Sequence, residues 1–246
     1  MSAKASPWKV HLEGRHSDLQ HLELCFTSHP LRVTKDEREG GFVYASDAFG
    51  GCAASDEVLA IAEKELSVLS GVLKLARASR EPVRAGAVHR CNESGGRDVF
   101  VRDTLRVRVD FDVTVEATNC ESQPVAESPS VPRTVRFARL ALADSAVAKV
   151  MRLVAATDSD EWVCLYRIYE VVEADVGGEL ALKALGWGSA DDRRRFKHSA
   201  NSVAVAGDAA RHGKEQTTPP ANPMSQEEAV AYVHSLVSSW LSSKGA

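Results

Sequence analysis

The sequence predicts an α+β protein, in which an N-terminal, mostly antiparallel sheet with one helix precedes a C-terminal bundle of four or five helices. Three observations lead to this prediction. Apolar and polar residues alternate over much of residues 1–117, as in strands with one face in solvent. Residues 118–134, TNCESQPVAESPSVPRT, contain three prolines and indicate a linker. Apolar residues then recur with helical spacing, so that we expect a second domain over 135–246.

Strands are expected where the alternation is clearest. In chain order they are residues 8–12, 22–26, 30–33, 42–45, 83–90, 99–101 and 105–115. The first two are expected to form a hairpin, because turn-forming residues lie between them at 14–18. The last is the strongest prediction, since six apolar residues point to one side and mostly charged residues to the other.

Helices are expected where apolar residues share one helical face. The expected segments are 55–75, 135–154, a helix capped by Asp158 and closed by Gly177 and Gly178, a short helix over 180–185, one that begins at Ser189 and runs toward His198, and one that begins at the capping box 225–228. Trp162, Tyr166 and Tyr169 fall at helical spacing, and Trp240 lies on the expected buried side of the last helix. We interpret them as core residues rather than as a platform for stacking bases.

Composition bounds the function. The 246 residues are 44% hydrophobic and carry a net charge of −4, which excludes wholesale disorder and gives no overall attraction to nucleic acid or an anionic membrane. No apolar run reaches the roughly 20 residues that span a bilayer, so we expect a cytoplasmic protein without a membrane partner. The five cysteines are too far apart to form a C-x-x-C pair, and no phosphate-binding glycine loop occurs. We expect no metal site and no cofactor.

The most informative segment of the chain is residues 189–223. Its last part, 199–223, is rich in Ala, Gly, Asn, Thr and Pro, and a connection of this length is uncommon in a compact domain unless it is functional or disordered. Basic residues outnumber acidic ones here, and clustered cations are what a phosphate-binding surface needs. The candidate binding residues are Arg194, Arg195, Lys197, Asn201, Asp208, Arg211, His212 and Lys214. The simpler interpretation is a solvated helix face whose arginines pair with nearby acids.

Arg193 and His198 are the candidate catalytic residues. They are separated by four residues on a predicted helix. In metal-independent ribonucleases a histidine can move the proton of the ribose 2′-hydroxyl, while an arginine stabilises the charge that develops on the phosphorus. This pair and its polar surroundings predict an endoribonuclease that needs no metal.

The helical half resembles the HEPN superfamily, compact bundles that are common in toxin and antiviral-defence proteins. The resemblance covers residues 135–243 and is most specific around 193–225, where the phrases RRFKHSANS and GDAARHGKE resemble those of a group of bacterial proteins. It implies RNA or a nucleotide as partner, a role in stress or antiphage defence, and a homodimer formed through the helical domain. Arg194 departs from the polar Asn, Asp or His that commonly follows the motif arginine, and many HEPN-like domains lack catalysis.

Three hypotheses therefore stand at the level of sequence. The protein is a ribonuclease, or a binding module for RNA, nucleotide or protein, or a structural protein whose polar loop holds the bundle together. In the third, Asp208 would pair with Arg211. The placement of His198 and His212 discriminates among them: both in one open, basic groove would favour the first two hypotheses.

Overall fold

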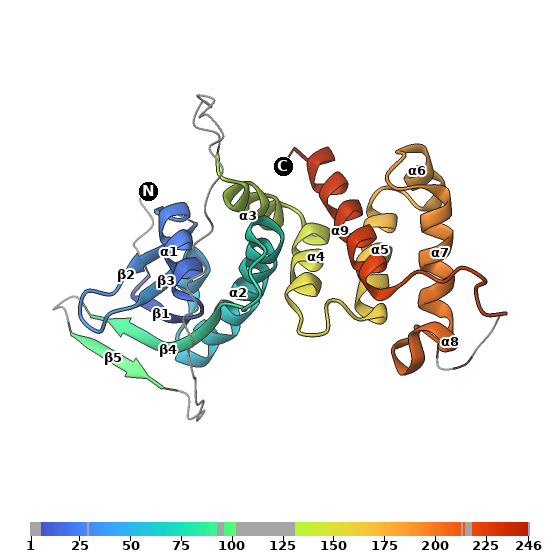
Figure 1. Ribbon diagram of the computed structural model, residues 1–246. Helices are drawn as coiled ribbons and strands as arrows, with labels where there is room; N and C mark the ends of the chain where they lie inside the picture. The colour runs from blue at the N-terminus through green and yellow to red at the C-terminus, as the bar shows by residue number, and fades with distance from the viewer. Residues whose placement is uncertain are drawn as a thin grey trace, which may run out of the picture.

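The computed structural model describes residues 6–28, 30–92, 96–101, 131–212, 214 and 218–245. The strand expected at 105–115 and most of the expected linker lie outside these residues. Figure 1 shows a sheet at one end of the molecule and a group of helices at the other, with the long helix α2 (Ser55–Arg77) and helices α3 (Arg133–Ala143) and α4 (Ser145–Ala155) between them. The α+β class is confirmed.

The sheet has five antiparallel strands in the described residues. They are β1 (Trp8–Glu13), β2 (Leu31–Lys35), β3 (Phe42–Ser46), β4 (Arg84–Cys91) and β5 (Arg97–Phe100), arranged in the order β2-β3-β1-β4-β5. Strands β2 and β3 form an antiparallel hairpin, with Leu31 opposite Ser46 and Lys35 opposite Phe42. β1 lies in the middle and pairs with β3 on one side and β4 on the other.

The strand expected at 22–26 is wrong, because this segment belongs to helix α1 (His16–Cys25). Leu19 and Leu22 are buried three residues apart, as on a helix, whereas Leu24 is 73% exposed. A strand would have placed Leu22 and Leu24 on the same face. Burial of Leu19 together with Leu22 selects the helix, so the sheet packs on two helices rather than on one.

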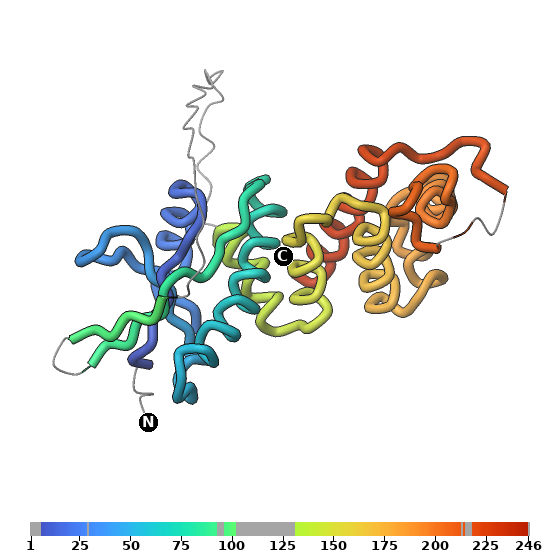
Figure 2. The backbone as a smooth tube through the Cα atoms, turned by 90° about the horizontal axis from the view of Figure 1, so that it is seen from below, coloured from blue at the N-terminus to red at the C-terminus, as the bar shows by residue number. Residues whose placement is uncertain are grey.

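Helix α2 connects the sheet to the helical half of the molecule (Figure 2). Val58, Ala62, Leu66 and Leu69 belong to the hydrophobic core beneath the sheet, as their spacing predicts. Val72 of the same helix belongs to the core of the bundle. Conversely, Ala138 of α3 packs into the core beneath the sheet. The two cores therefore meet along α2.

The helical half continues with α5 (Trp162–Asp175), α6 (Glu179–Ala184), α7 (Ala190–Asn201), α8 (Val203–Ala206) and α9 (Gln226–Ser243). The single helix expected over 135–154 is two helices. Asp144 adopts an extended backbone between them, and its carboxylate accepts hydrogen bonds from the N–H groups of Ala146 and Val147. Asp158 is not a helix cap, because α5 begins four residues later behind Glu161.

Aromatic side chains form the centre of the bundle. Phe196 of α7 is fully buried, and the rings of Trp162, Tyr166, Tyr169 and Tyr232 all lie around it, with centroids 5.4–6.1 Å from its own. This confirms the core interpretation of the aromatic stripe on α5. Because α7 is attached to the bundle through Phe196, its remaining faces are available to polar residues.

Candidate functional site

Helix α7 carries most of the predicted site residues. Ser189 caps it by accepting a hydrogen bond from the N–H of Asp192, and Asp191 and Asp192 lie in its first turn. The helix extends beyond His198 to Asn201, and the short helix α8 follows. The expected loop over 199–223 is therefore helical at its start.

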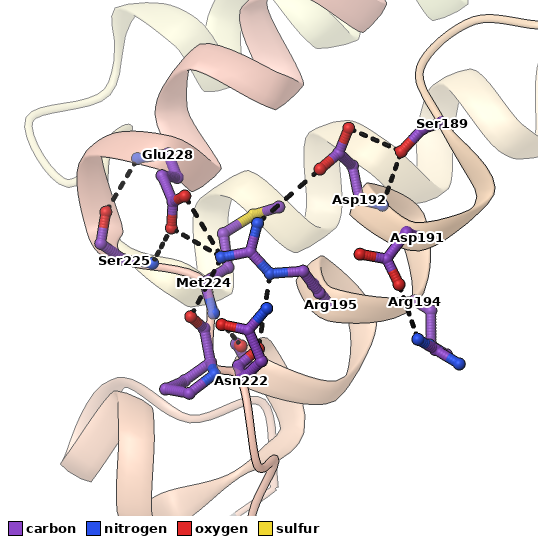
Figure 3. Close-up of polar contacts among 11 residues, drawn as sticks. Ser189, Asp191, Asp192, Arg194, Arg195, Asn222, Met224, Ser225 and Glu228 are labelled. Atoms are coloured by element: carbon purple, nitrogen blue, oxygen red, sulfur yellow. Dashed lines mark hydrogen bonds and ion pairs between the residues drawn. The ribbon is translucent and has the colours of Figure 1, made fainter.

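Neighbouring arginines of α7 point in opposite directions (Figure 3). The Arg195 guanidinium reaches the start of α9, where it donates to the carbonyls of Asn222 and Pro223 and lies 3.0 Å from a carboxylate oxygen of Glu228. The Arg194 side chain is 79% exposed and pairs with Asp191 at 2.6 Å. Arg195 therefore connects α7 to α9, while Arg194 belongs to the opposite, open side.

That open side is a pocket of about 870 Å³ formed by α6, α7 and the chain after α8. The residues that line it are Glu179, Lys183, Ala190, Asp191, Arg193, Arg194, Lys197, His198, Asn201 and His212. Among these, four cationic side chains face two carboxylates, so that the pocket carries a surplus of positive charge even when both histidines are neutral. This surplus contrasts with the net negative charge of the whole chain.

Arg193 is the buried cation of the pocket, with only 3% of its surface exposed. One of its terminal nitrogens lies 3.5 Å from the carbonyl of Trp187, and its Nε has no hydrogen-bond partner among the described residues. No carboxylate of the described residues forms an ion pair with it. Burial raises the pKa of the neighbouring Tyr232, and the Arg193 charge counteracts that rise.

The two histidines of the pocket come from different segments. His198 lies in the last turn of α7, and its Nε2 is 2.9 Å from the carbonyl oxygen of Thr218. A carbonyl only accepts hydrogen bonds, so Nε2 carries the proton and the ring is held in one orientation. His212 lies 14 positions further along the chain and is half-buried in the same pocket.

Carboxylates neutralise part of the positive charge. Glu179 of α6 lies 2.8 Å from Lys183 and 3.2 Å from Lys197, and these two cations lower its pKa to about 2. Burial alone would lower the Lys197 pKa, but the hydrogen bond to Glu179 and the charges of Glu173 and Glu179 outweigh burial and raise it. Lys197 is therefore charged at neutral pH, and both lysines are paired with Glu179.

Of the remaining predicted residues, Asp208, Arg211 and Lys214 lie outside the pocket. Arg211 pairs with Glu170 at 2.8 Å and stacks over the ring of Tyr166. The expected pair of Arg211 with Asp208 is therefore wrong. Asp208 and Lys214 are exposed. Asn201 lines the pocket, and its amide donates to the Lys197 carbonyl at 2.6 Å.

Four lining residues were not among the predicted site residues. Ala190 and Asp191 lie at the start of α7, and Glu179 and Lys183 lie on α6, which is only six residues long. The signal for Glu179 and Lys183 in the sequence was their spacing of four residues, which places a glutamate and a lysine on one helical face. That signal indicates a surface ion pair and says nothing about a pocket.

Comparison with known proteins adds no identification. No protein-family model, curated protein or solved structure matches this chain. Within the described residues, no helix has both the length and the apolar character needed to cross a membrane. In the same part of the chain, no three His, Cys, Asp or Glu side chains are grouped as metal ligands. The chemistry of the α7 pocket is therefore the basis for a functional proposal.

Proposed function

We propose that the α7 pocket binds the phosphate groups of RNA and cleaves RNA without a metal ion. One observation carries the proposal: the buried Arg193, which has no carboxylate partner among the described residues, lines the same open pocket as His198 and His212. A buried charge without a counter-ion is costly. A phosphate bound in the pocket would supply that counter-ion.

The pocket offers the charge and the donors that a phosphodiester needs. Guanidinium groups bind phosphate oxygens through paired N–H donors, and Arg193 and Arg194 both line the pocket. Arg194 is largely exposed, so a phosphate can replace its surface ion pair with Asp191 at little cost. The arginines would also stabilise the extra charge of the pentacovalent phosphorus.

The two histidines can carry out the proton transfers. Neutral His198 would take the proton of the ribose 2′-hydroxyl as the 2′-oxygen forms its bond to phosphorus. As the bond from phosphorus to the 5′-oxygen breaks, protonated His212 would give a proton to that oxygen. The products are a 2′,3′-cyclic phosphate and a 5′-hydroxyl end, and neither step requires a metal. The hydrogen bond to Thr218 orients the His198 ring for this task.

The ion pairs of the pocket favour a second candidate, a non-catalytic interaction protein. Lys183 and Lys197 are both paired with Glu179, and Arg195 holds α9 rather than facing the pocket. In this case the polar residues around α7 stabilise the bundle. The two candidates differ in whether the protein acts on RNA.

The test is incubation of the purified protein with RNA oligonucleotides in EDTA, with the same sequences as 2′-O-methyl RNA and as DNA. We expect cleavage of RNA alone, with cyclic phosphate ends identified by mass spectrometry. His198→Ala and His212→Ala should each slow cleavage by about a hundredfold or more. His16→Ala is the matched control, because His16 lies exposed on α1, outside the pocket.

Each outcome selects one hypothesis. If the wild-type protein binds RNA without cleaving it, and Arg193→Met abolishes that binding, the catalytic part of the proposal is contradicted. An RNA-binding module is then favoured. If the protein shows no RNA binding at low salt and no cleavage over a range of pH, the proposal is overturned and the structural-protein hypothesis remains. Cleavage that persists in both histidine variants would indicate a contaminating nuclease.

A further inference from the structure

A second pocket lies where the sheet meets the bundle, and no part of the proposed function uses it. Its volume is about 430 Å³, within the usual range for small-molecule sites. We name it the junction pocket; its lining comes from β2, the segment after β3, α2, α3 and α4, and consists of Leu31, Ala48, Ile61, Lys64, Glu65, Val68, Leu69, Ala138, Ala141, Leu142, Ala148 and Arg152.

Most of the junction pocket wall is apolar, and much of it is made of small side chains. Alanines at 48, 138, 141 and 148 line it from three different segments. At such positions larger residues would fill the space between α2, α3 and α4. Leu142, which also lines the pocket, is 52% exposed. The pocket therefore provides space and contact for an aliphatic or aromatic side chain.

Glu65 places an oriented carboxylate in this apolar wall. One of its oxygens accepts a hydrogen bond of 2.7 Å from the hydroxyl of Tyr44, and the other accepts one of 3.0 Å from Ser46. The Tyr44 side chain is fully buried, so the carboxylate is held from behind by a rigid part of the sheet. Each carboxylate oxygen has a second lone pair, and these remain for a donor in the pocket.

Two cations, Lys64 and Arg152, complete the lining. Neither has an ion-pair partner in the described part of the chain, and neither approaches Glu65 closely enough to form one. The pocket thus presents one negative and two positive groups that form no ion pair with one another, although the Lys64 charge opposes the rise that burial causes in the Glu65 pKa. A ligand with both charges would satisfy both sides, whereas a ligand with one charge would leave the other side uncompensated.

We propose that the junction pocket binds a small zwitterion with an apolar side chain, a free amino acid of the leucine or phenylalanine type. Glu65 holds the ammonium group, Arg152 and Lys64 hold the carboxylate, and the alanine-rich wall holds the side chain. The helices α2 and α4, which carry these charged groups, also join the sheet to the bundle. The site is separate from the α7 pocket, so its test is independent of the RNA proposal.

Isothermal titration calorimetry of the full chain with four probes tests this proposal by measuring the affinity for each. The probes are L-leucine, 3-methylbutylamine, which lacks the carboxylate, 4-methylpentanoate, which lacks the ammonium group, and glycine, which lacks the side chain. We expect leucine to bind at least tenfold more tightly than each of the other three. A carboxylate or an amine that binds as tightly as leucine, or no binding of any probe at millimolar concentration, would overturn the proposal.

Variants locate the site. Arg152→Gln should weaken leucine binding at least tenfold, and Ala148→Leu should do the same by filling the pocket. Glu65→Gln tests the ammonium contact, with circular dichroism to check that the fold survives the change to the Tyr44 and Ser46 hydrogen bonds. Lys149→Gln is the matched control, because this exposed residue of α4 does not line the junction pocket. Leucine binding that is unchanged in both Arg152→Gln and Ala148→Leu would place the ligand elsewhere and contradict the proposal.

Discussion

Gly71 of α2 lies directly against the main-chain carbonyl of Met151 of α4, with no space for a Cβ atom between them. The two helices contribute to different cores, since α2 carries much of the core beneath the sheet, whereas Met151 of α4 belongs to the core of the bundle. Only glycine allows the two backbones to come so near. The contact holds the two cores together.

Gly71→Ala should therefore destabilise the protein, although alanine is the better helix former. We expect a loss of about 1–3 kcal/mol in the free energy of unfolding, since the added methyl group must displace backbone. Urea unfolding followed by circular dichroism measures it. Gly50→Ala is the control, because nothing lies within 4 Å of the Cβ position there. Equal stability of the two variants would show that the helices separate easily.

Trp240 of α9 should be the most sensitive aromatic residue to truncation. It is fully buried, and its indole N–H donates to Asp175 at 2.8 Å. Trp240→Ala should cost roughly 3–5 kcal/mol, as other large-to-small core changes do. Trp240→Phe keeps most of the packing and should cost less. A thermal midpoint unchanged in Trp240→Ala would contradict the core assignment.

Arg194 and Arg195 should separate function from stability. Arg195→Ala removes the contacts to the carbonyls of Asn222 and Pro223 and to Glu228, so we expect the thermal midpoint to fall by about 2–4 °C. Arg194→Ala should leave the midpoint unchanged, because its ion pair lies at the surface, and should weaken RNA binding. Differential scanning fluorimetry and filter binding measure the two effects. If instead Arg195→Ala weakens RNA binding and Arg194→Ala lowers the thermal midpoint, the functional surface lies on the α9 side of α7.

Arg193→Met should leave stability equal or raise it, while it abolishes action on RNA. Arg193 is buried without a carboxylate partner among the described residues, and methionine fills similar space without a charge to desolvate. Urea unfolding and the cleavage assay measure the two properties on one sample. A clear loss of stability would indicate that Arg193 is held by interactions that favour its charge, and would support a structural role.

His89 of β4 should make stability depend on pH. Its side chain is fully buried, and burial, followed by the charge of Arg97, lowers its pKa against the opposing effects of Glu39 and Asp36; the charge of His11 lowers it further. As the pH falls through about 6.5, His89 therefore takes up a proton in the unfolded chain but not in the folded protein. Its contribution to the free energy of unfolding is fully present above this pH and is lost below it. The loss contributed by one group is at most about 1.4 kcal/mol per pH unit.

Urea unfolding at pH 5 to 8 measures this dependence, with His89→Leu as the comparison. Burial also lowers the pKa values of His21 and His234, so the wild-type slope contains their contributions too. The difference between wild type and variant isolates His89. Identical slopes would mean that folding does not change the pKa of His89, and would contradict the prediction.

The sequence by itself determined the elements whose local pattern is long or chemically explicit. The repeat of apolar residues over α2, the capping box at Ser225, and the alternation in β1 to β4 each predict the observed element, because a residue's neighbours in the chain decide it. The buried aromatic stripe on α5 belongs to the same group. Of the candidate site, the sequence predicted that α7 would carry the basic residues.

Only the tertiary structure decided the rest. Residues 22–26 alternate as a strand does, but a five-residue pattern fits both structures, and burial of Leu19 with Leu22 selects the helix α1. The sequence treats Arg194 and Arg195 alike, yet α7 packs through Phe196 and so directs one arginine to α9 and the other to the pocket. His198 and His212 meet in one pocket with Glu179 and Lys183 because the chain folds back across α6 and α7. Local periodicity reports which face of an element is apolar, whereas a pocket is formed by distant segments whose packing no local pattern contains.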